Sequence, residues 1–125
     1  MAETTCILKL GEGADIMDGL QKIADEKGID YGFLVSCSGR IQEFELLSSS
    51  SGGGVDKMKF MNPFEVNAIS GKVQRQKGNK LAAHIRISVT STGFTPLAGQ
   101  LISGKAAGNF EIGIRKIDMK KIIEA

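Results

Sequence analysis

The sequence predicts an α+β domain in which one N-terminal helix packs on a mainly antiparallel β-sheet of about seven strands. Three observations support this prediction. Residues 14–27 carry a single apolar stripe at helical spacing. Much of the remaining chain alternates apolar and polar side chains with the period of a strand. Short turns rich in glycine, proline or asparagine separate these segments, and such turns favour hairpins and antiparallel pairing.

The first strand is expected at residues 4–10, and a turn at residues 11–13 leads into the helix. The apolar stripe of this helix consists of Ile16, Met17, Leu20, Ile23 and Ala24. Acidic side chains near the start of the helix and lysines near its end complement the helix dipole. Gly28 is the expected stop just past the last turn.

The middle of the chain is predicted to be extended. Residues 31–48 form a strand with a bend at residues 36–39, and the four serines and three glycines of residues 48–54 form a flexible hairpin tip. A short strand at residues 55–61 ends at Asn62-Pro63, and a further strand follows at residues 64–76. In that strand we expect Phe64, Val66 and Ala68 on one face and Glu65, Asn67 and Ile69 on the other.

The clearest strand pattern lies in residues 81–90. There Ala83, Ile85, Ile87 and Val89 alternate with His84, Arg86, Ser88 and Thr90. The turn at residues 77–80 joins this strand to the preceding one as a hairpin, and the turn at residues 91–96 leads to the next. The last two strands are expected at residues 97–104 and 109–118, followed by a short helical tail.

Length and composition indicate one domain over residues 1–125, with a core at about residues 4–118. No apolar run reaches the length of a membrane span, and the first twenty residues lack the layout of a signal peptide. We therefore expect a cytoplasmic protein without a membrane partner, or a nuclear one if the source is eukaryotic. Cys6 and Cys37 are too few for a disulfide framework and are expected to be reduced.

Charge is distributed unevenly although the net charge is only +2. Residues 1–65 hold eleven acidic and six basic residues, whereas residues 66–110 hold six basic residues and no acidic one. Such asymmetry indicates an anionic partner, nucleic acid or a phosphorylated ligand. Four of the basic residues flank one hairpin turn and are candidates for contacts with DNA phosphates: Lys72, Arg75, Lys77 and Lys80. The alternative is an ordinary solvated face, balanced in space by the acidic half.

Several short motifs follow one another along residues 6–116. They are Leu10-Gly11-Glu12-Gly13, Ile16-Met17-Asp18-Gly19-Leu20, Ser38-Gly39, Pro63-Phe64-Glu65-Val66, Ser70-Gly71-Lys72-Val73, Ala83-His84-Ile85-Arg86-Ile87-Ser88, Ala98-Gly99-Gln100-Leu101 and Glu111. Together they resemble the plants and prokaryotes conserved (PPC) domain, which also occurs beside AT-hooks in plant nuclear proteins. The resemblance implies a homotrimer of subunits with an antiparallel sheet and one main helix, and an association with DNA.

The sequence departs from the metal site that the resemblance implies. Many prokaryotic members carry a His-x-His pair and a later Gly-Gly-His-Leu, whose three histidines can hold a metal. Here only His84 matches, because Arg86 takes the second position and Gln100 the third. A guanidinium offers no lone pair, so we expect neither a metal nor another cofactor. The AT-hook motif Arg-Gly-Arg-Pro is also absent.

The same residues suggest a polar cleft. Strand parity places His84 and Arg86 on one face, Gln100 can reach that face from the next strand, and Glu65 or Glu111 is expected nearby. Such a cleft would suit a small anion, with Arg86 as a planar fork for carboxylate or phosphate. The alternative is that Arg86 pairs with Glu65 or Glu111, within the sheet or at a trimer interface, while His84 is a satisfied core histidine.

Two functions follow from these observations. The first is a non-enzymatic, homotrimeric PPC-domain protein that binds DNA or regulates through it, with Lys72, Arg75, Lys77 and Lys80 at the phosphates. The second is a trimeric protein that binds a small anion or metabolite at His84, Arg86, Gln100 and Glu65. An enzyme would need a nucleophile such as Cys37 activated by His84. Because no Gly-x-Ser-x-Gly motif is present, we assign no catalytic residue.

Overall fold

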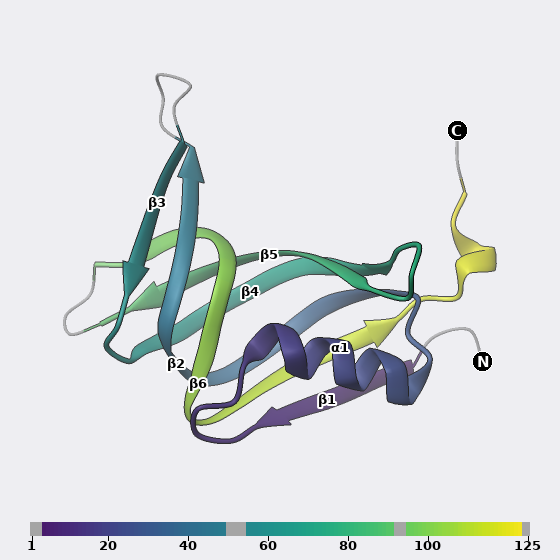
Figure 1. Cartoon of the computed structure of the whole chain (residues 1–125), viewed down its shortest axis with the longest axis horizontal. Helices are drawn as coiled ribbons and strands as arrows, with labels where there is room; N and C mark the ends of the chain where they lie inside the picture. Colours follow the sequence, from purple (N-terminus) through teal and green to yellow (C-terminus); the bar gives the residue numbers. More distant parts are fainter. Residues whose placement is uncertain (1–3, 50–54, 92–94, 124–125) are drawn as a thin grey trace.

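The computed structural model describes residues 4–49, 55–91 and 95–123. Its elements, in chain order, are β1 (Thr4–Leu10), α1 (Ile16–Lys27), β2 (Tyr31–Ser49), β3 (Val55–Phe60), β4 (Phe64–Arg75), β5 (Leu81–Thr90), β6 (Leu97–Lys116) and the short 3₁₀ helix η1 (Met119–Lys121) (Figure 1). All strand pairs are antiparallel. The predicted α+β class with one main helix is therefore confirmed. Residues 50–54, most of the predicted serine- and glycine-rich tip, lie outside the described residues.

The sheet has six strands, and the prediction of about seven is wrong because the last two merge. Residues 97–104 and 109–118 were expected as separate strands, but β6 runs unbroken for 20 residues. It stays paired with the 19-residue β2 through the intervening segment, where Arg40 faces Ala107 and Gln42 faces Lys105. Register shifts in β2 on both sides of this segment let the two strands bend together. The bend expected at residues 36–39 does not interrupt β2. It coincides with register shifts at both ends of this segment, and Gly39 adopts φ +121°.

A loop from the N-terminal region supports the bent part of β6. The carboxylate of Glu12 accepts the backbone N–H of Gly108 at 2.6 Å and the side-chain amide of Gln42 at 2.5 Å. These hydrogen bonds, that from Gly108 first, hold the pKa of Glu12 below its usual value. Glu12 therefore ties the start of α1 to both of the long strands.

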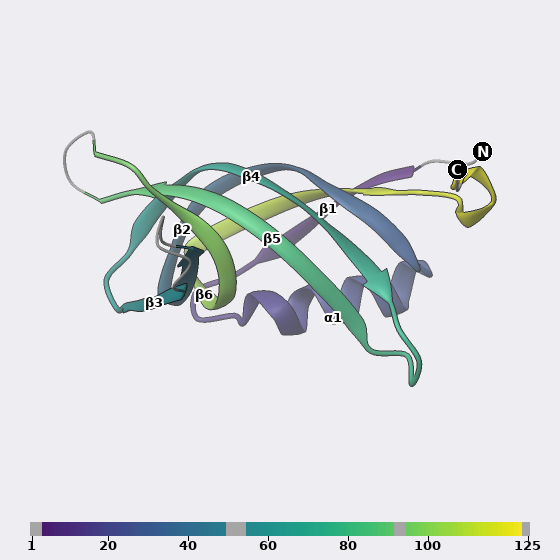
Figure 2. The same ribbon diagram turned by 90° about the horizontal axis from the view of Figure 1, so that it is seen from above.

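The strand order is β1-β6-β5-β4-β2-β3, with a further pairing between β6 and β2. This extra pairing closes β2, β4, β5 and β6 into a ring, while β1 and β3 remain at the edges. Seen from above, the strands arch over α1, so the helix covers one face of the sheet (Figure 2). Among the described residues, neither α1 nor η1 is long and apolar enough to cross a membrane.

Helix α1 ends at Lys27 as the sequence predicts and begins at Ile16, two residues later than the predicted start at residue 14. The side chain of Asp15 caps it by accepting the N–H of Asp18 at 2.9 Å, and Gly28 ends it in the left-handed conformation. Four members of the predicted stripe are buried, namely Ile16, Leu20, Ile23 and Ala24. Gly19 lets the helix approach β1 closely, because a Cβ there would lie 2.6 Å from Cδ2 of Leu10.

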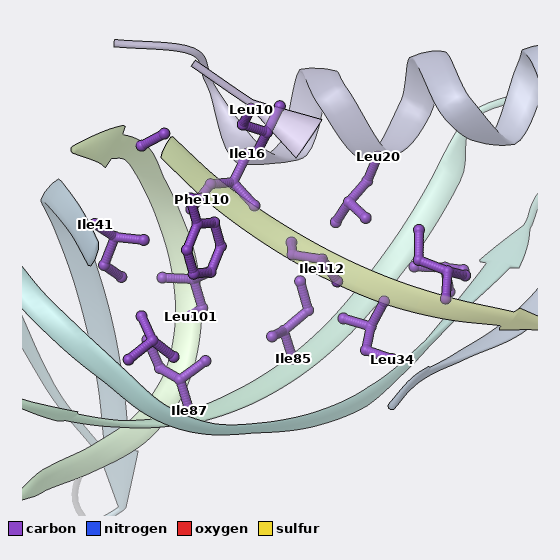
Figure 3. Packing of buried hydrophobic residues seen from close by; sticks show 14 of the residues in the cluster. Leu10, Ile16, Leu20, Leu34, Ile41, Ile85, Ile87, Leu101, Phe110 and Ile112 are labelled. Atoms are coloured by element: carbon purple, nitrogen blue, oxygen red, sulfur yellow. The ribbon is translucent and has the colours of Figure 1, made fainter. Parts of the chain in front are cut away.

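The core fills the space between α1 and the strands. Figure 3 shows the ring of Phe110 among Ile16, Ile41 and Leu101, which come from α1, β2 and β6. One facing prediction is wrong: Ala68 is exposed, and Ile69 packs against the core instead. A register shift between Val66 and Ala68 adds one residue to β4 relative to β5, and one extra residue exchanges the two faces of a strand.

Candidate functional site

Six polar or aromatic side chains form two cross-strand rows on the face of the sheet opposite α1. In the first row Phe33 of β2 faces Lys72 of β4, which faces His84 of β5. Directly paired residues share one face of a sheet, so these three side chains point the same way. The neighbouring Ile85 is fully buried on the helix side, which places this row on the outer face.

The second row lies two residues along the same strands. Ser70 of β4 faces Arg86 of β5, and Arg86 faces Gln100 of β6. A step of two residues returns to the same face at a distance of about 7 Å. The two rows therefore form one continuous polar surface that spans four strands.

These rows surround a hollow of about 390 Å³, which we call the outer hollow. Its lining residues are Phe33, Ser70, Gly71, Lys72, His84, Ile85, Arg86 and Gln100. Three of the four residues predicted for a ligand cleft lie here, namely His84, Arg86 and Gln100. Sequence reasoning missed Phe33 and Ser70, which could be found only from the register of β2 and β4.

Glu65, the fourth predicted cleft residue, lies elsewhere. It is opposite Thr90 and Arg40, away from the two rows. In the part of the chain that the structure describes, the ion pairs join Arg75 to Asp25, Arg75 to Asp30, and Lys105 to Glu43. The pairing of Arg86 with Glu65 or Glu111, considered as an alternative from the sequence, is therefore not formed within the described chain.

The outer hollow collects positive charge without a carboxylate among its lining residues. Arg86 offers a planar fork of N–H donors, and Lys72 a compact ammonium. The ammonium of Lys72 lies 6.0 Å from the ring centroid of Tyr31, which steadies it over the aromatic face. Ser70 and Gln100 flank Arg86 and can donate or accept hydrogen bonds beside it. This set of groups is suited to binding an anion.

All the hydrogen-bond donors of the Arg75 guanidinium are used within the protein. Its guanidinium donates to the carboxylates of Asp25 at 2.6 Å and Asp30 at 3.4 Å. It also donates to three carbonyl oxygens, those of Ala24 at 3.1 Å, Ile29 at 3.1 Å and Asn79 at 2.9 Å. A guanidinium has five N–H donors, and these five bonds occupy all of them.

This geometry makes Arg75 a clamp between the end of α1 and the β4–β5 hairpin. Its side chain is only 16% exposed. The hydrogen bond from Arg75 lowers the pKa of Asp25, and the same bond raises the pKa of Arg75. With no donor left for a phosphate, Arg75 is removed from the predicted DNA-contacting set. Charge counting along the sequence could not detect this, because the helix end that Arg75 clamps is about fifty residues away in the chain.

Arg75→Ala is expected to lower the free energy of unfolding by about 2 kcal/mol, because it removes charge-assisted hydrogen bonds to carboxylate and carbonyl oxygens. Chemical denaturation at neutral pH measures this change. Lys77→Ala in the adjacent turn is the control, and as an exposed substitution it should change stability by less than about 0.5 kcal/mol. Equal stability of the two variants would contradict the clamp.

Lys77 and Lys80 lie at the tip of the β4–β5 hairpin. Gly78 and Asn79 turn the chain with φ of +83° and +65°, and the N–H of Gln76 closes the turn on the carbonyl of Lys80 at 2.8 Å. Both lysines are exposed, and neither is in an ion pair with another described residue. The four predicted basic residues are thus divided between the outer hollow, the clamp and the hairpin tip.

The residues of the outer hollow do not fit a metal ion. Arg86, which faces Gln100, holds a guanidinium that cannot ligate a metal. Among the other polar lining side chains, Lys72 is a cation without a lone pair, and one imidazole (His84), one amide (Gln100) and one hydroxyl (Ser70) remain. Within residues 4–49, 55–91 and 95–123, no three His, Cys, Asp or Glu side chains gather as a metal site would require.

The cysteines show no arrangement for nucleophilic catalysis within the described residues. Cys37 packs against the core, with its Sγ 3.9 Å from the carbonyl oxygen of Val66, and burial raises the pKa of its thiol. His84 points to the outer face and is exposed. Cys37 and His84 therefore do not form the dyad that an enzyme would use.

A family model described as the Plants and Prokaryotes Conserved (PCC) domain matches residues 1–118. No curated protein is similar enough to the chain to count as a relative. Several solved structures share the fold. A PPC protein from Pyrococcus horikoshii superposes with a TM-score of 0.81 at 16% identity, covering 95% of this chain and 82% of that one.

Two further solved structures differ in how they are described. A metal-containing protein from Archaeoglobus fulgidus gives a TM-score of 0.79 at 21% identity and covers 94% of this chain and 82% of its own. A candidate DNA-binding protein from Bacteroides thetaiotaomicron gives 0.75 at 23% identity, with 96% and 82% covered. At these identities the likeness concerns the fold alone.

Proposed function

Since the chain belongs to the Plants and Prokaryotes Conserved (PCC) domain family, we propose that it is a non-enzymatic homotrimer that associates with DNA through the β4–β5 hairpin. The contacts are ionic and involve the phosphate backbone, so sequence preference is weak. Lys77 and Lys80 carry them, and Lys72 extends the positive surface along β4.

One observation carries this proposal. The tip of the β4–β5 hairpin presents two exposed lysines that have no ion-pair partner among the described residues. They belong to residues 66–110, which contain no acidic residue. The nearby carboxylates of Asp25 and Asp30 are paired with Arg75, so the two lysines of the tip are left to contact the phosphates of a duplex.

Two further observations support the proposal. The solved structures from Bacteroides thetaiotaomicron and Ralstonia eutropha are both described as candidate DNA-binding proteins. The outer face of the sheet also exposes three large apolar side chains, Ile7 at 50%, Phe33 at 41% and Val35 at 41%. Apolar side chains on an uncovered sheet face favour self-association, and three copies would multiply the phosphate contacts.

Lys77→Glu/Lys80→Glu is expected to weaken binding to a labelled duplex at least tenfold at low salt, because two attractive contacts per subunit become repulsive. Fluorescence anisotropy measures the affinity. The matched control is Lys57→Glu/Lys59→Glu on β3, where both lysines are exposed and the charge change is the same. Equal losses in the two variants would show that net charge alone governs binding, and the proposed hairpin contact would then be rejected.

A further inference from the structure

We propose that the outer hollow is a binding site for a small organic anion with one carboxylate or phosphate group and a flat apolar body. This site shares Lys72 with the positive surface along β4, but it does not include Lys77 and Lys80, which carry the proposed DNA contact at the hairpin tip. The proposal rests on the charge and the size of the hollow and on the exposed aromatic ring at its side.

The charge of the hollow calls for an anion. Lys72 and Arg86 lie on adjacent strands in neighbouring rows, about two residues apart along the sheet. No ion pair between described residues neutralises either of them. Two cations held on one rigid surface repel each other, and an anion bound between them would relieve that repulsion. A carboxylate or phosphate can take two parallel hydrogen bonds from Arg86 and a third from Lys72.

One side of the hollow presents an exposed aromatic ring. Phe33 lies beyond Lys72 in the first row, between Lys72 and the exposed Arg115 of β6, and is 41% exposed. An exposed phenyl ring offers a surface against which a flat group can pack. Arg86 lies in the other row and two strands away from Phe33, so the guanidinium and the ring can hold opposite ends of one molecule. This separates the expected ligand from inorganic phosphate, which would contact the cations alone.

The size of the hollow limits the ligand. A volume of about 390 Å³ lies near the lower end of the range for small-molecule sites. Gln100 and Ser70 flank Arg86 in its row and can fix the orientation of the head group by hydrogen bonds. All lining residues are on strands, so the site needs little ordering before it binds.

The test compares four probes by isothermal titration calorimetry on the full chain: phenyl phosphate, benzoate, inorganic phosphate and phenol. We expect phenyl phosphate or benzoate to bind at least tenfold more tightly than inorganic phosphate, and phenol not to bind measurably. The tighter of the two aromatic anions identifies the head group. If neither binds more tightly than inorganic phosphate, the proposal is wrong.

Variants then locate the site. Arg86→Gln should weaken the preferred probe at least tenfold, since it removes the fork but keeps a polar side chain of similar length. Phe33→Ala should reduce the ratio between the affinity for the preferred aromatic probe and the affinity for inorganic phosphate. Arg40→Gln is the control, because Arg40 is an exposed arginine of β2 outside the hollow, and this variant should bind like the unchanged protein. Equal weakening by Arg86→Gln and Arg40→Gln would overturn the assignment.

Two outcomes distinguish an anion site from DNA binding at the hairpin tip and from a contact between subunits. Lys77→Glu/Lys80→Glu should leave probe binding unchanged even where it abolishes DNA binding, so the two proposals can fail independently. The other outcome concerns self-association. If no probe binds and Arg86→Gln dissociates the assembly in light scattering, the hollow is a contact between subunits and the anion site does not exist.

Discussion

Phe110→Ala is expected to destabilise the protein by about 3–5 kcal/mol, the largest effect of any single substitution considered for this fold. Phe110 is 2% exposed and lies where α1, β2 and β6 meet (Figure 3). Its Cδ1 also packs on Gly39, where a Cβ would come within 3.3 Å of it. Truncation would leave a cavity between bent strands that the backbone pairing prevents from collapsing.

Chemical denaturation measures this loss, and Met58→Ala provides the control. Met58 lies on the edge strand β3 and is 61% exposed, so its truncation should change the free energy of unfolding by less than about 0.5 kcal/mol. A loss of less than about 1 kcal/mol for Phe110→Ala would show that this part of the core is not packed as described.

Gly71→Ala is expected to cost about 3 kcal/mol and to disturb the outer hollow as well. A Cβ at this position would lie 2.1 Å from the carbonyl oxygen of His84 and 2.9 Å from the Cα of Ile85, both backbone atoms of β5. Backbone atoms cannot rotate away, so β4 and β5 would have to separate. The φ of Gly71, +147°, adds a conformational cost for any other residue.

Gly78→Ala separates the steric cost of the added Cβ from the conformational cost of a positive φ. Gly78 also has a positive φ, +83°, but a Cβ there would meet nothing within 4 Å. Its replacement should therefore cost only the conformational penalty, about 1 kcal/mol. Thermal or chemical unfolding of both variants gives the difference. If Gly71→Ala is no more destabilising than Gly78→Ala, the close approach of β4 and β5 at this point is incorrect.

Local patterns predicted the individual elements well because their causes are local. The limits of α1 depend on Asp15, Gly28 and an apolar stripe, which are all visible within fifteen residues. The alternation in β5 likewise identified its buried face, with Ile85, Ile87 and Val89 inside. The merging of two expected strands into β6 was not predictable in this way. It depends on pairing with β2, more than fifty residues earlier in the chain.

In the candidate site, too, local patterns predicted some positions, whereas others depend on pairing between distant strands. Strand parity placed His84 and Arg86 on one face, and the cross-strand position of Gln100 followed from the hairpin. Phe33 and Lys72 could not be assigned to that surface, because their place depends on the register between β2 and β4. Arg75 was misjudged for a related reason: its charge is visible in the sequence, but the acceptors that occupy it are not.

The most direct test of the central claim, that the β4–β5 hairpin contacts DNA phosphates, is the salt dependence of duplex binding. Anisotropy of a labelled AT-rich duplex should give a log affinity that falls linearly with log salt concentration, with a slope of about −0.9 for each phosphate contact. Lys77→Glu/Lys80→Glu should reduce the magnitude of that slope by about 2 for each subunit in contact. No binding at low salt, or a slope unchanged in the variant, would contradict the claim.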